Sequence, residues 1–246
     1  MSDERLDIHN SAVPKVCIAC EARHRGVCGA LAPDQLVKLS RTTSRHVFEA
    51  DDELVPAGDE IRHYSNILSG VVKLTRLMAD GRQQIVGLQF APDFLGRPFR
   101  SSSEISAEAA TEVRVCSFPK NTLEEIIREA PELEHKLHEQ ALKELDEARE
   151  WILTLGRKSA AEKVASFLHL IATHIDPEQL AKGEMVQFEL PLKRADIADF
   201  LGLTIETVSR QMTKLRKSGV IELDGARTVK VPSMAALERA SAADLE

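Results

Sequence analysis

The four cysteines are the residues whose type and spacing suit metal chemistry. Cys17, Cys20 and Cys28 form a C-x2-C-x7-C cluster near the N-terminus, and Cys116 stands alone far downstream. In a reducing cytoplasm, clustered cysteines more often bind metal or perform redox chemistry than form disulfides. The two-residue gap lets one short turn direct two sulfurs at the same ion. The wider gap contains Gly26, which we expect to give slack for reaching around a larger object.

Four thiolates are suitable ligands for either a zinc ion or an iron–sulfur cluster. Their spacing does not separate these choices, and His24 is a further possible zinc ligand. A third interpretation leaves the cysteines unligated, with Cys116 a buried residue of a strand. A thiol redox enzyme is not expected, because its C-x-x-C normally begins a helix after a strand and carries a lowered thiol pKa. Here Cys17 belongs to a polar and, we expect, flexible N-terminal segment.

A second pattern lies between residues 192 and 218 and predicts two short helices bent around Gly202. Glycine suits the left-handed position that ends the first helix. Thr204 can cap the second helix, which we expect to run to Ser218 and to stop at Gly219. The apolar residues that follow helical spacing on both sides of the turn are Ile197, Leu201, Leu203, Val208 and Leu215. This is the pattern of a helix-turn-helix, whose second helix enters the major groove of DNA.

The second predicted helix presents side chains suited to reading bases. Glu206, Ser209 and Arg210 are three and four residues apart, so they share one face. Arg210 can donate to O6 and N7 of guanine, Glu206 can accept from the amino group of cytosine, and Ser209 can bond a base edge or a phosphate. The predicted DNA contacts are Glu206, Thr207, Ser209, Arg210, Lys214, Arg216 and Lys217, the last three on phosphates. The alternative is an ordinary helical hairpin with a solvated charged face.

The residues that follow predict the wing of a winged helix. Val220–Leu223 and Arg227–Val231 read as two short strands on either side of Asp224-Gly225, a strong hairpin turn signal. Ser233 then caps a short terminal helix.

Composition narrows the class of protein. A chain of 246 residues usually forms one or two domains. The net charge of −7 argues against general affinity for nucleic acid, yet residues 193–217 hold six Lys or Arg against three Asp or Glu, a local charge of +3. We therefore expect salt-sensitive, specific binding by one module. No apolar run approaches the roughly 20 residues that span a bilayer, and Met1–Val13 lacks the apolar part of a signal peptide, so we expect a cytoplasmic protein.

The spacing of apolar residues changes from a strand pattern to a helix pattern near residue 120. From about Leu31 to Phe118, short apolar strands alternate with glycine-rich turns, which predicts an all-β roll or barrel. Tyr64–Leu68, Val71–Leu77 and Gln83–Phe90 are the clearest strands.

From Asn121 onward the pattern is helical. Asn121 with Glu124 is the expected N-cap pair of the first helix, and Ser159 with Glu162 forms a capping box further along.

A long helix is expected between these caps, from about Pro131 to Leu155. A coiled-coil-like stripe in steps of three and four runs along it, formed by His138, Ala141, Leu145, Ala148, Ile152 and Leu155. We predict that this stripe is a homodimer seam, because a twofold axis would set two reading helices about 34 Å apart on a palindrome. The alternative is that the stripe packs on the β-roll of its own chain. Its small apolar area suits a dimer that can be switched.

The predicted class is therefore α+β, with four segments in sequence. These are a cysteine-rich cluster-binding segment (1–30), a β-roll sensor domain (31–120), a dimerisation helix (121–156) and a winged helix-turn-helix (157–246).

Together these features resemble the CRP/FNR superfamily of bacterial transcription regulators. Glu206-Thr-Val-Ser209-Arg210, the cysteine cluster and Cys116 before Phe118-Pro119 are similar to the oxygen-responsive FNR branch, and the position of the third cysteine resembles its alphaproteobacterial forms. The resemblance implies that the four cysteines ligate an oxygen-labile [4Fe-4S] cluster, one per subunit. It further implies that the cluster favours the dimer that binds DNA, and that oxygen converts it to a [2Fe-2S] form and then to monomeric apoprotein.

The resemblance also implies partners. The operator would be a TTGAT-N4-ATCAA-like palindrome in double-stranded promoter DNA, and the protein, not an enzyme, would activate or repress anaerobic genes with RNA polymerase. The turn Asp80-Gly81-Arg82 is the candidate polymerase contact. Where the family has an inhibitory acidic residue at the seam, this chain has Ala148. Some dimer without cluster is therefore expected to persist.

Two related regulators remain as alternatives. A cyclic-nucleotide sensor is the nearest, since Asp93-Phe94-Leu95-Gly96 resembles the nucleotide pocket of that branch, but the segment Arg100–Ala107 lacks its Arg-Ser/Thr-Ala phosphate clamp. A constitutive, zinc-stapled repressor is the other, and metal content separates it from the oxygen-responsive interpretation.

Overall fold

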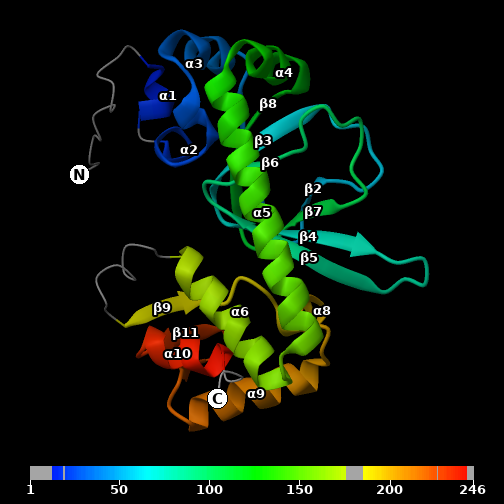
Figure 1. Cartoon of the computed structure of the whole chain (residues 1–246), viewed down its shortest axis with the longest axis vertical. Helices are drawn as coiled ribbons and strands as arrows, with labels where there is room; N and C mark the ends of the chain where they lie inside the picture. Colours follow the sequence, from blue (N-terminus) through cyan, green and yellow to red (C-terminus); the bar gives the residue numbers. More distant parts are fainter. Residues whose placement is uncertain (1–12, 19, 176–184, 226, 243–246) are drawn as a thin grey trace. The chain divides into compact units, whose positions relative to one another are not determined.

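The computed structural model describes residues 13–18, 20–175, 185–225 and 227–242. Its chain divides into two compact units (Figure 1). The first comprises residues 1–77 and 86–146, and the second comprises residues 78–85 and 147–246. Residues 1–12, on which the argument about a signal peptide rests, lie outside the described residues.

Two four-stranded antiparallel sheets form a β-roll that belongs to the first unit except for the start of β5. One sheet has the order β1-β8-β3-β6 and the other the order β2-β7-β4-β5. The strands are β1 (Ser44–Phe48), β2 (Glu53–Val55), β3 (His63–Ser69), β4 (Val71–Leu77), β5 (Gln83–Phe90), β6 (Phe94–Leu95), β7 (Ser106–Ala109) and β8 (Val113–Pro119). The predicted roll and its three clearest strands are confirmed, and each of these strands buries several of its residues without a strict alternation of buried and exposed positions.

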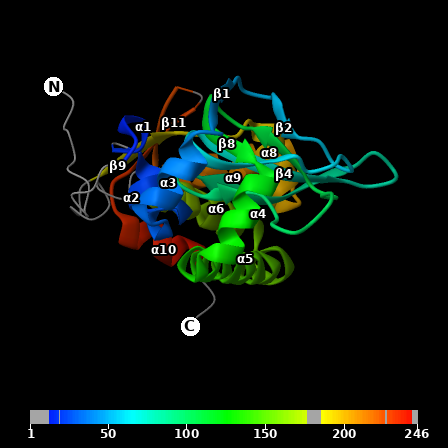
Figure 2. The same cartoon turned by 90° about the horizontal axis from the view of Figure 1, so that it is seen from above.

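Helices precede and follow the roll. They are α1 (Lys15–Ile18), α2 (Glu21–His24), the 3-10 helix η1 (Val27–Ala30), α3 (Pro33–Ser40) and α4 (Lys120–Glu129). Seen from above, α1, α2 and α3 lie together at one end of the unit (Figure 2).

Two expectations for this region are wrong. The segment that carries the first three cysteines is not a polar arm, because Ala22, Arg23 and Val27 are buried. The chain after Leu31 also does not enter the roll directly, since α3 intervenes. The helix α3 has Pro33 at its first position, where proline is favoured. It buries Leu36 and Leu39, which are three residues apart as on one helix face. The prediction of strands from Leu31 onward did not take account of these features.

The predicted N-cap pair of α4 is also wrong. The helix begins at Lys120, and its N-cap is Pro119, two residues before Asn121. This proline ends β8 and makes no side-chain cap bond. Glu124 instead turns into the unit, where its Oε1 accepts hydrogen bonds from the Tyr64 hydroxyl (2.7 Å) and the Phe99 backbone N–H (2.8 Å). Burial and this carboxylate raise the pKa of Tyr64 well above its usual value.

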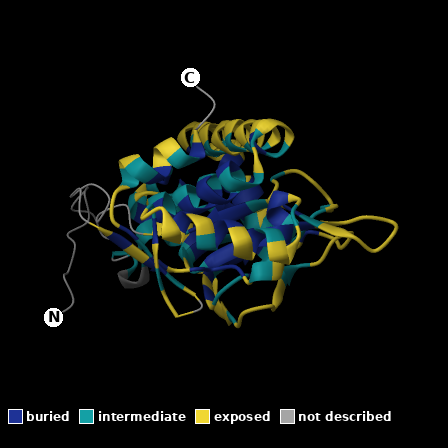
Figure 3. Cartoon of the chain, turned by 90° about the horizontal axis from the view of Figure 1, so that it is seen from below, coloured by how far each residue is buried: buried dark blue, intermediate teal, exposed yellow. Residues whose placement is uncertain are grey.

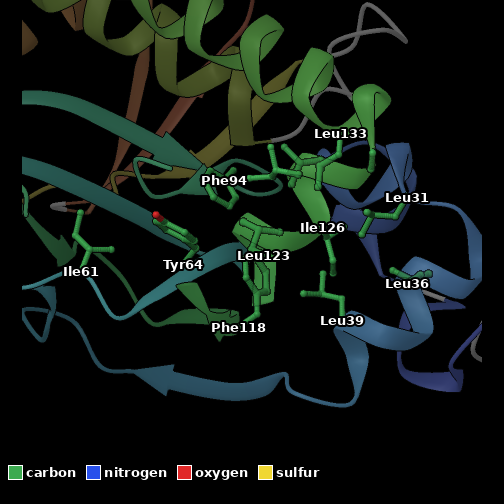
Figure 4. Close-up of a cluster of buried hydrophobic side chains, with 13 residues drawn as sticks. Leu31, Leu36, Leu39, Ile61, Tyr64, Phe94, Phe118, Leu123, Ile126 and Leu133 are labelled. Carbon is green, nitrogen blue, oxygen red and sulfur yellow. The ribbon is translucent and has the colours of Figure 1, made fainter. Parts of the chain in front are cut away.

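A continuous apolar core joins the helices to the roll. Tyr64, Phe94 and Phe118 from the strands meet Leu123 and Ile126 of α4 (Figure 4), each of them at most 3% exposed. Val27, Leu31, Leu36 and Leu39 extend the same core toward the N-terminal helices. The side chains of Cys17 and Cys28 pack against it, so the core positions two of the predicted ligands.

The long helix α5 (Pro131–Arg157) ends two residues beyond its predicted limit. Most of its length is exposed, shown in yellow in Figure 3. No helix among the described residues combines the length and the apolar character needed to cross a membrane.

The second unit contains a helix pair and a small sheet. Its elements are α6 (Ala160–Ile175), β9 (Val186–Glu189), α8 (Arg194–Leu201), α9 (Ile205–Lys217), β10 (Glu222–Asp224), β11 (Thr228–Val231) and α10 (Met234–Ser241). Local bonds confirm the predicted caps. Ser159 and Glu162 form the reciprocal capping box, and Ser233 Oγ accepts from the N–H of Ala236.

The predicted wing hairpin is present with two differences. Its first strand begins at Glu222, because the N–H groups of Val220 and Ile221 bond back to Leu215 O and close the preceding helix. A third strand, β9, pairs with β11 to complete the order β10-β11-β9. Residues 185–189 are too short a run to have been assigned to this sheet from sequence, since their partner lies about 40 residues on.

Candidate functional site

The four cysteines come from four different local structures in the first unit. Cys17 lies in α1, Cys20 is the N-cap of α2, Cys28 lies in η1 and Cys116 occupies the middle of β8. The turn between the first two is closed by a hydrogen bond from Cys20 N to Cys17 O (3.3 Å). This bond fixes the backbones of the two cysteines close together, and the prediction that both sulfurs face one metal centre stays a prediction.

The pKa values of the thiols indicate that the four sulfurs are neighbours. Burial, together with the nearby Cys20 and Cys116, raises the pKa of Cys17 to about 11. Burial likewise raises the pKa of Cys28, with additional contributions from all three other cysteines. The pKa of Cys116 is raised by burial and by Cys20. Such mutual effects require short separations between the groups.

Strand pairing brings the distant cysteine to this place. In the first sheet Cys116 is paired with Arg45 of β1 on one side and with Asn66 of β3 on the other. Asn66 Nδ2 also donates a hydrogen bond to Cys28 Sγ (3.0 Å). Arg45 lowers the pKa of Cys17 and Cys116, and Arg23 that of Cys17, so positive charge adjoins the thiols.

Gly26 serves a different purpose from the slack expected of it. Its φ of −96° is ordinary for any residue, but an added Cβ would lie 2.8 Å from Pro92 O and 3.0 Å from Ala22 Cα. The glycine therefore permits close packing of the turn between α2 and η1. His24 is directed elsewhere, with Nε2 2.6 Å from the carbonyl oxygen of Ile18.

The arrangement is not that of ligands closed around one ion. Within the described ranges, no three His, Cys, Asp or Glu side chains are grouped closely enough to hold a single metal ion. Sulfurs of a tetrahedral zinc site, at Zn–S distances of about 2.3 Å, must lie within about 4 Å of one another. A cluster of several iron atoms accepts a wider set of thiolates.

The second candidate site is α9 with the turn before it. Gly202 takes the predicted left-handed conformation (φ 61°, ψ 42°) at the end of α8. Thr204 Oγ1 caps α9 by accepting from Thr207 N (3.2 Å). Val208, Met212 and Leu215 bury one face of α9, which leaves the opposite face to solvent.

The predicted DNA contacts lie mainly on that open face. Glu206, Ser209 and Arg210 are exposed, Thr207 is half-buried, and the basic residues of the last turns are exposed; these are Lys214, Arg216 and Lys217. The Arg210 guanidinium donates to Thr207 Oγ1 (3.4 Å), which holds it over the first turns. The pKa of Glu206 is lowered by bonds from its own backbone N–H and from Thr204, so it is ionised at neutral pH.

The predicted dimer stripe is largely exposed along α5. His138, Ala141, Leu145, Ala148 and Ile152 are exposed, with Ile152 at 70%, and Leu155 is half-buried. Leu142 and Leu153, at 62% and 51% exposure, add apolar area that the stripe did not include.

Family models and relatives of known role match the segments that form both structural units. A family model described as a Crp-like helix-turn-helix domain matches residues 162–240, and one described as a cyclic nucleotide-binding domain matches residues 45–130. A probable transcriptional activator of Rhizobium leguminosarum bv. viciae is 57% identical over 97% of this chain and 98% of its own. The transcriptional activator protein FnrL of Cereibacter sphaeroides is 40% identical over 90% of each chain.

The chain belongs to the CRP/FNR family of transcription regulators. Among solved structures, that of FixK2 from Bradyrhizobium japonicum covers 80% of this chain and 96% of its own, with a TM-score of 0.71 and 30% identity. The protein is thus a DNA-binding regulator built from a β-roll and a helix-turn-helix, and not an enzyme.

Sequence reasoning missed three residues beside the thiols of this regulator. Arg23, Arg45 and Asn66 carry no motif, and two of them sit on strands whose pairing partners are distant in sequence. The sequence places Arg23 between Cys20 and Cys28, but only the structure shows that it is buried, where a cation requires compensating negative charge.

Proposed function

We propose that this regulator responds to oxygen through a [4Fe-4S] cluster, one per subunit, ligated by Cys17, Cys20, Cys28 and Cys116. The observation that carries the proposal is that four thiols from two distant parts of the chain lie within electrostatic range beside the sensor core. The donor set consists of sulfur alone, which suits an iron–sulfur cluster. The similarity to a protein named FnrL supports the same choice.

The residues of the proposed cluster site have different roles. Cys116 belongs to the sheet, while the other three belong to the helices before it, so a bound cluster would supply an oxygen-sensitive cross-link between these parts. Arg23 and Arg45 add positive charge that favours thiolates. Burial raises the pKa of Cys17, Cys28 and Cys116, so these thiols must lose protons when the site is loaded.

The output of the switch is DNA binding by a homodimer. We propose that the exposed stripe of α5, from His138 to Leu155, forms the seam, with Leu142 and Leu153 beside it. Glu206, Ser209 and Arg210 then read a TTGAT-N4-ATCAA-like palindrome, with Thr207 beneath them. Lys214, Arg216 and Lys217 bind phosphates. The division into a cluster segment, sensor roll, dimerisation helix and reader follows from these roles.

The remaining partners follow from the same proposal. The protein works in the cytoplasm on promoter DNA, where it activates or represses anaerobic genes with RNA polymerase. The exposed turn Asp80-Gly81-Arg82, held by an ion pair between Arg82 and Asp80 (2.7 Å), is the proposed polymerase contact.

A cyclic nucleotide is not the ligand that the roll favours. Its interior holds a cavity of about 240 Å³ whose apolar lining is accompanied by three acidic residues, Asp59, Glu60 and Glu144. Two arginines, Arg62 and Arg97, also line the cavity, and Arg62 is paired with Glu60 (3.3 Å). Three carboxylates outnumber two guanidinium groups there, so the lining disfavours a phosphate.

The decisive experiment is purification under nitrogen, with iron and sulfide assays and absorption spectra before and after air. We expect iron and sulfide in equal amounts, a coloured protein that bleaches in air, and a loss of operator binding on bleaching. The matched variant is Cys116→Ser, which should lack the cluster and fail to bind the operator without oxygen. A colourless protein that holds zinc would replace the oxygen switch with a zinc staple.

Sedimentation tests the seam separately. The protein purified under nitrogen should sediment as a dimer, and air should shift it toward monomer. Ile152→Glu should shift it toward monomer even without air, because it sets charge in the apolar stripe. A dimer unaffected by either change would exclude this seam.

A further inference from the structure

Asn66 is the residue that joins the two halves of the thiol site. It lies in the middle of β3 and is 1% exposed. Its side-chain amide donates to Cys28 Sγ over 3.0 Å, and its backbone is the register partner of Cys116 in β8. One side chain thus contacts a sulfur from the N-terminal helices while its strand holds the strand of the fourth cysteine.

The hydrogen bonding of this amide is incomplete. Its Oδ1 is buried and has no hydrogen-bond partner among the described residues. A buried acceptor left unbonded destabilises the fold, and an apolar side chain on β3 would avoid that penalty. Neighbouring Ser65, by contrast, bonds Ser117 Oγ (2.7 Å). Folding alone therefore gives no reason for an amide at position 66, whereas a donor beside a ligating sulfur does.

We propose that Asn66 is a positioning residue of the cluster site, which directs the sulfur of Cys28 toward Cys116 and stabilises its negative charge through an N–H···S bond. This inference rests on the proposed cluster. Hydrogen bonds to ligating sulfurs are a principal means by which proteins set the properties of iron–sulfur centres. Second-shell partners of this kind typically change metal retention by about 10–100-fold when removed.

The test compares Asn66→Leu and Asn66→Asp with wild-type protein loaded under nitrogen. Leu removes both the donor and the unbonded acceptor. Asp keeps the shape but offers no N–H, and its carboxylate repels the thiolate. Ser65→Ala is the matched control, since it removes a hydrogen bond from the adjacent residue of the same strand. The measurements are the rate of iron loss to an excess ferrous chelator, the Fe–S stretching bands in resonance Raman spectra, and thermal unfolding of the apoproteins.

We expect iron loss about ten-fold faster or more in both Asn66 variants, with shifted Fe–S bands, and wild-type behaviour in Ser65→Ala. The apoprotein of Asn66→Leu should unfold at or above the wild-type temperature, which separates the role in the site from a role in folding. If either folded Asn66 variant keeps wild-type retention and bands, the inference is wrong and the cluster proposal stands. If wild-type protein takes up no iron and sulfide, both fail together.

Discussion

The thiol site and the DNA-reading helix are built on opposite principles. The four cysteines are part-buried, come from three helical segments and a strand, and span residues 17–116. The residues proposed to contact DNA lie within one helix, from Glu206 to Lys217, and are mostly exposed. The thiol site depends on tertiary packing to bring its residues together, whereas packing of α9 leaves its charged face exposed to solvent.

This difference predicts where each site is vulnerable. A sensor that depends on a core responds to any substitution that loosens that core, even one away from the sulfurs. A reader displayed on a rigid helix responds to changes in the side chains themselves and in the caps that orient the helix. The predictions below, from the largest expected effect to the smallest, test this contrast.

Phe118→Ala should have the largest effect. Phe118 is 1% exposed, lies two residues from Cys116 and belongs to the core against which Cys17 and Cys28 pack. Its truncation should lower the free energy of unfolding by about 3–5 kcal/mol and impair cluster retention. Urea denaturation followed by circular dichroism measures the first and iron assays the second. Val47→Ala, at a strand residue 59% exposed, is the control and should change stability by about 0.5 kcal/mol or less.

Arg210→Ala should weaken operator binding by about 1–3 kcal/mol and relax specificity at one base pair. It should not change the stability of the fold, since Arg210 is exposed. Lys214→Ala is the comparison, because a phosphate contact affects all sequences alike and lowers the slope of affinity against salt by about one. Fluorescence anisotropy with the operator and single-base variants distinguishes them. If Arg210→Ala lowers the affinity equally for the operator and all single-base variants, Arg210 does not contact a base.

Gly202→Ala should destabilise the second unit by about 1–2 kcal/mol, because its left-handed backbone is strained for any residue with a Cβ. No atom lies within 4 Å of the added carbon, so packing contributes nothing. Gly156→Ala in α5 also meets no atom within 4 Å, but there the backbone is helical, and the change should stabilise by about 0.5–1 kcal/mol. Denaturant unfolding monitored by Trp151 fluorescence measures both. Shifts of the same sign would contradict the backbone argument.

Thr204→Ala should give the smallest effect, about 1 kcal/mol of stability, through loss of the cap on Thr207 N. Thr204→Ser keeps the hydroxyl and should behave like wild type. Operator affinity of the alanine variant should fall slightly, since the first turn of α9 carries the reading residues. If Thr204→Ser and Thr204→Ala lower the free energy of unfolding equally, the Thr204 hydroxyl does not cap the helix.

The sequence predicted the reader better than the sensor, for a reason visible in particular residues. Gly202, Thr204 and the buried face of α9 interact with groups three to five positions away, so spacing alone identifies them. Glu124 was misassigned because its partners are Tyr64 and the backbone of Phe99, which no helix periodicity reveals. β9 and the helices before the roll were missed for the same reason.

The sequence by itself determined which residues have the chemistry: sulfur at four positions, and a capped helix with a charged face. Only the tertiary structure decided that Asn66 of β3 is the register partner of Cys116 and also donates to the sulfur of Cys28. Helical contacts join residues three or four positions apart, so a short stretch of sequence is enough to predict them. Strand pairing joins residues of any separation, so its partners are fixed only when the sheet and its core have formed.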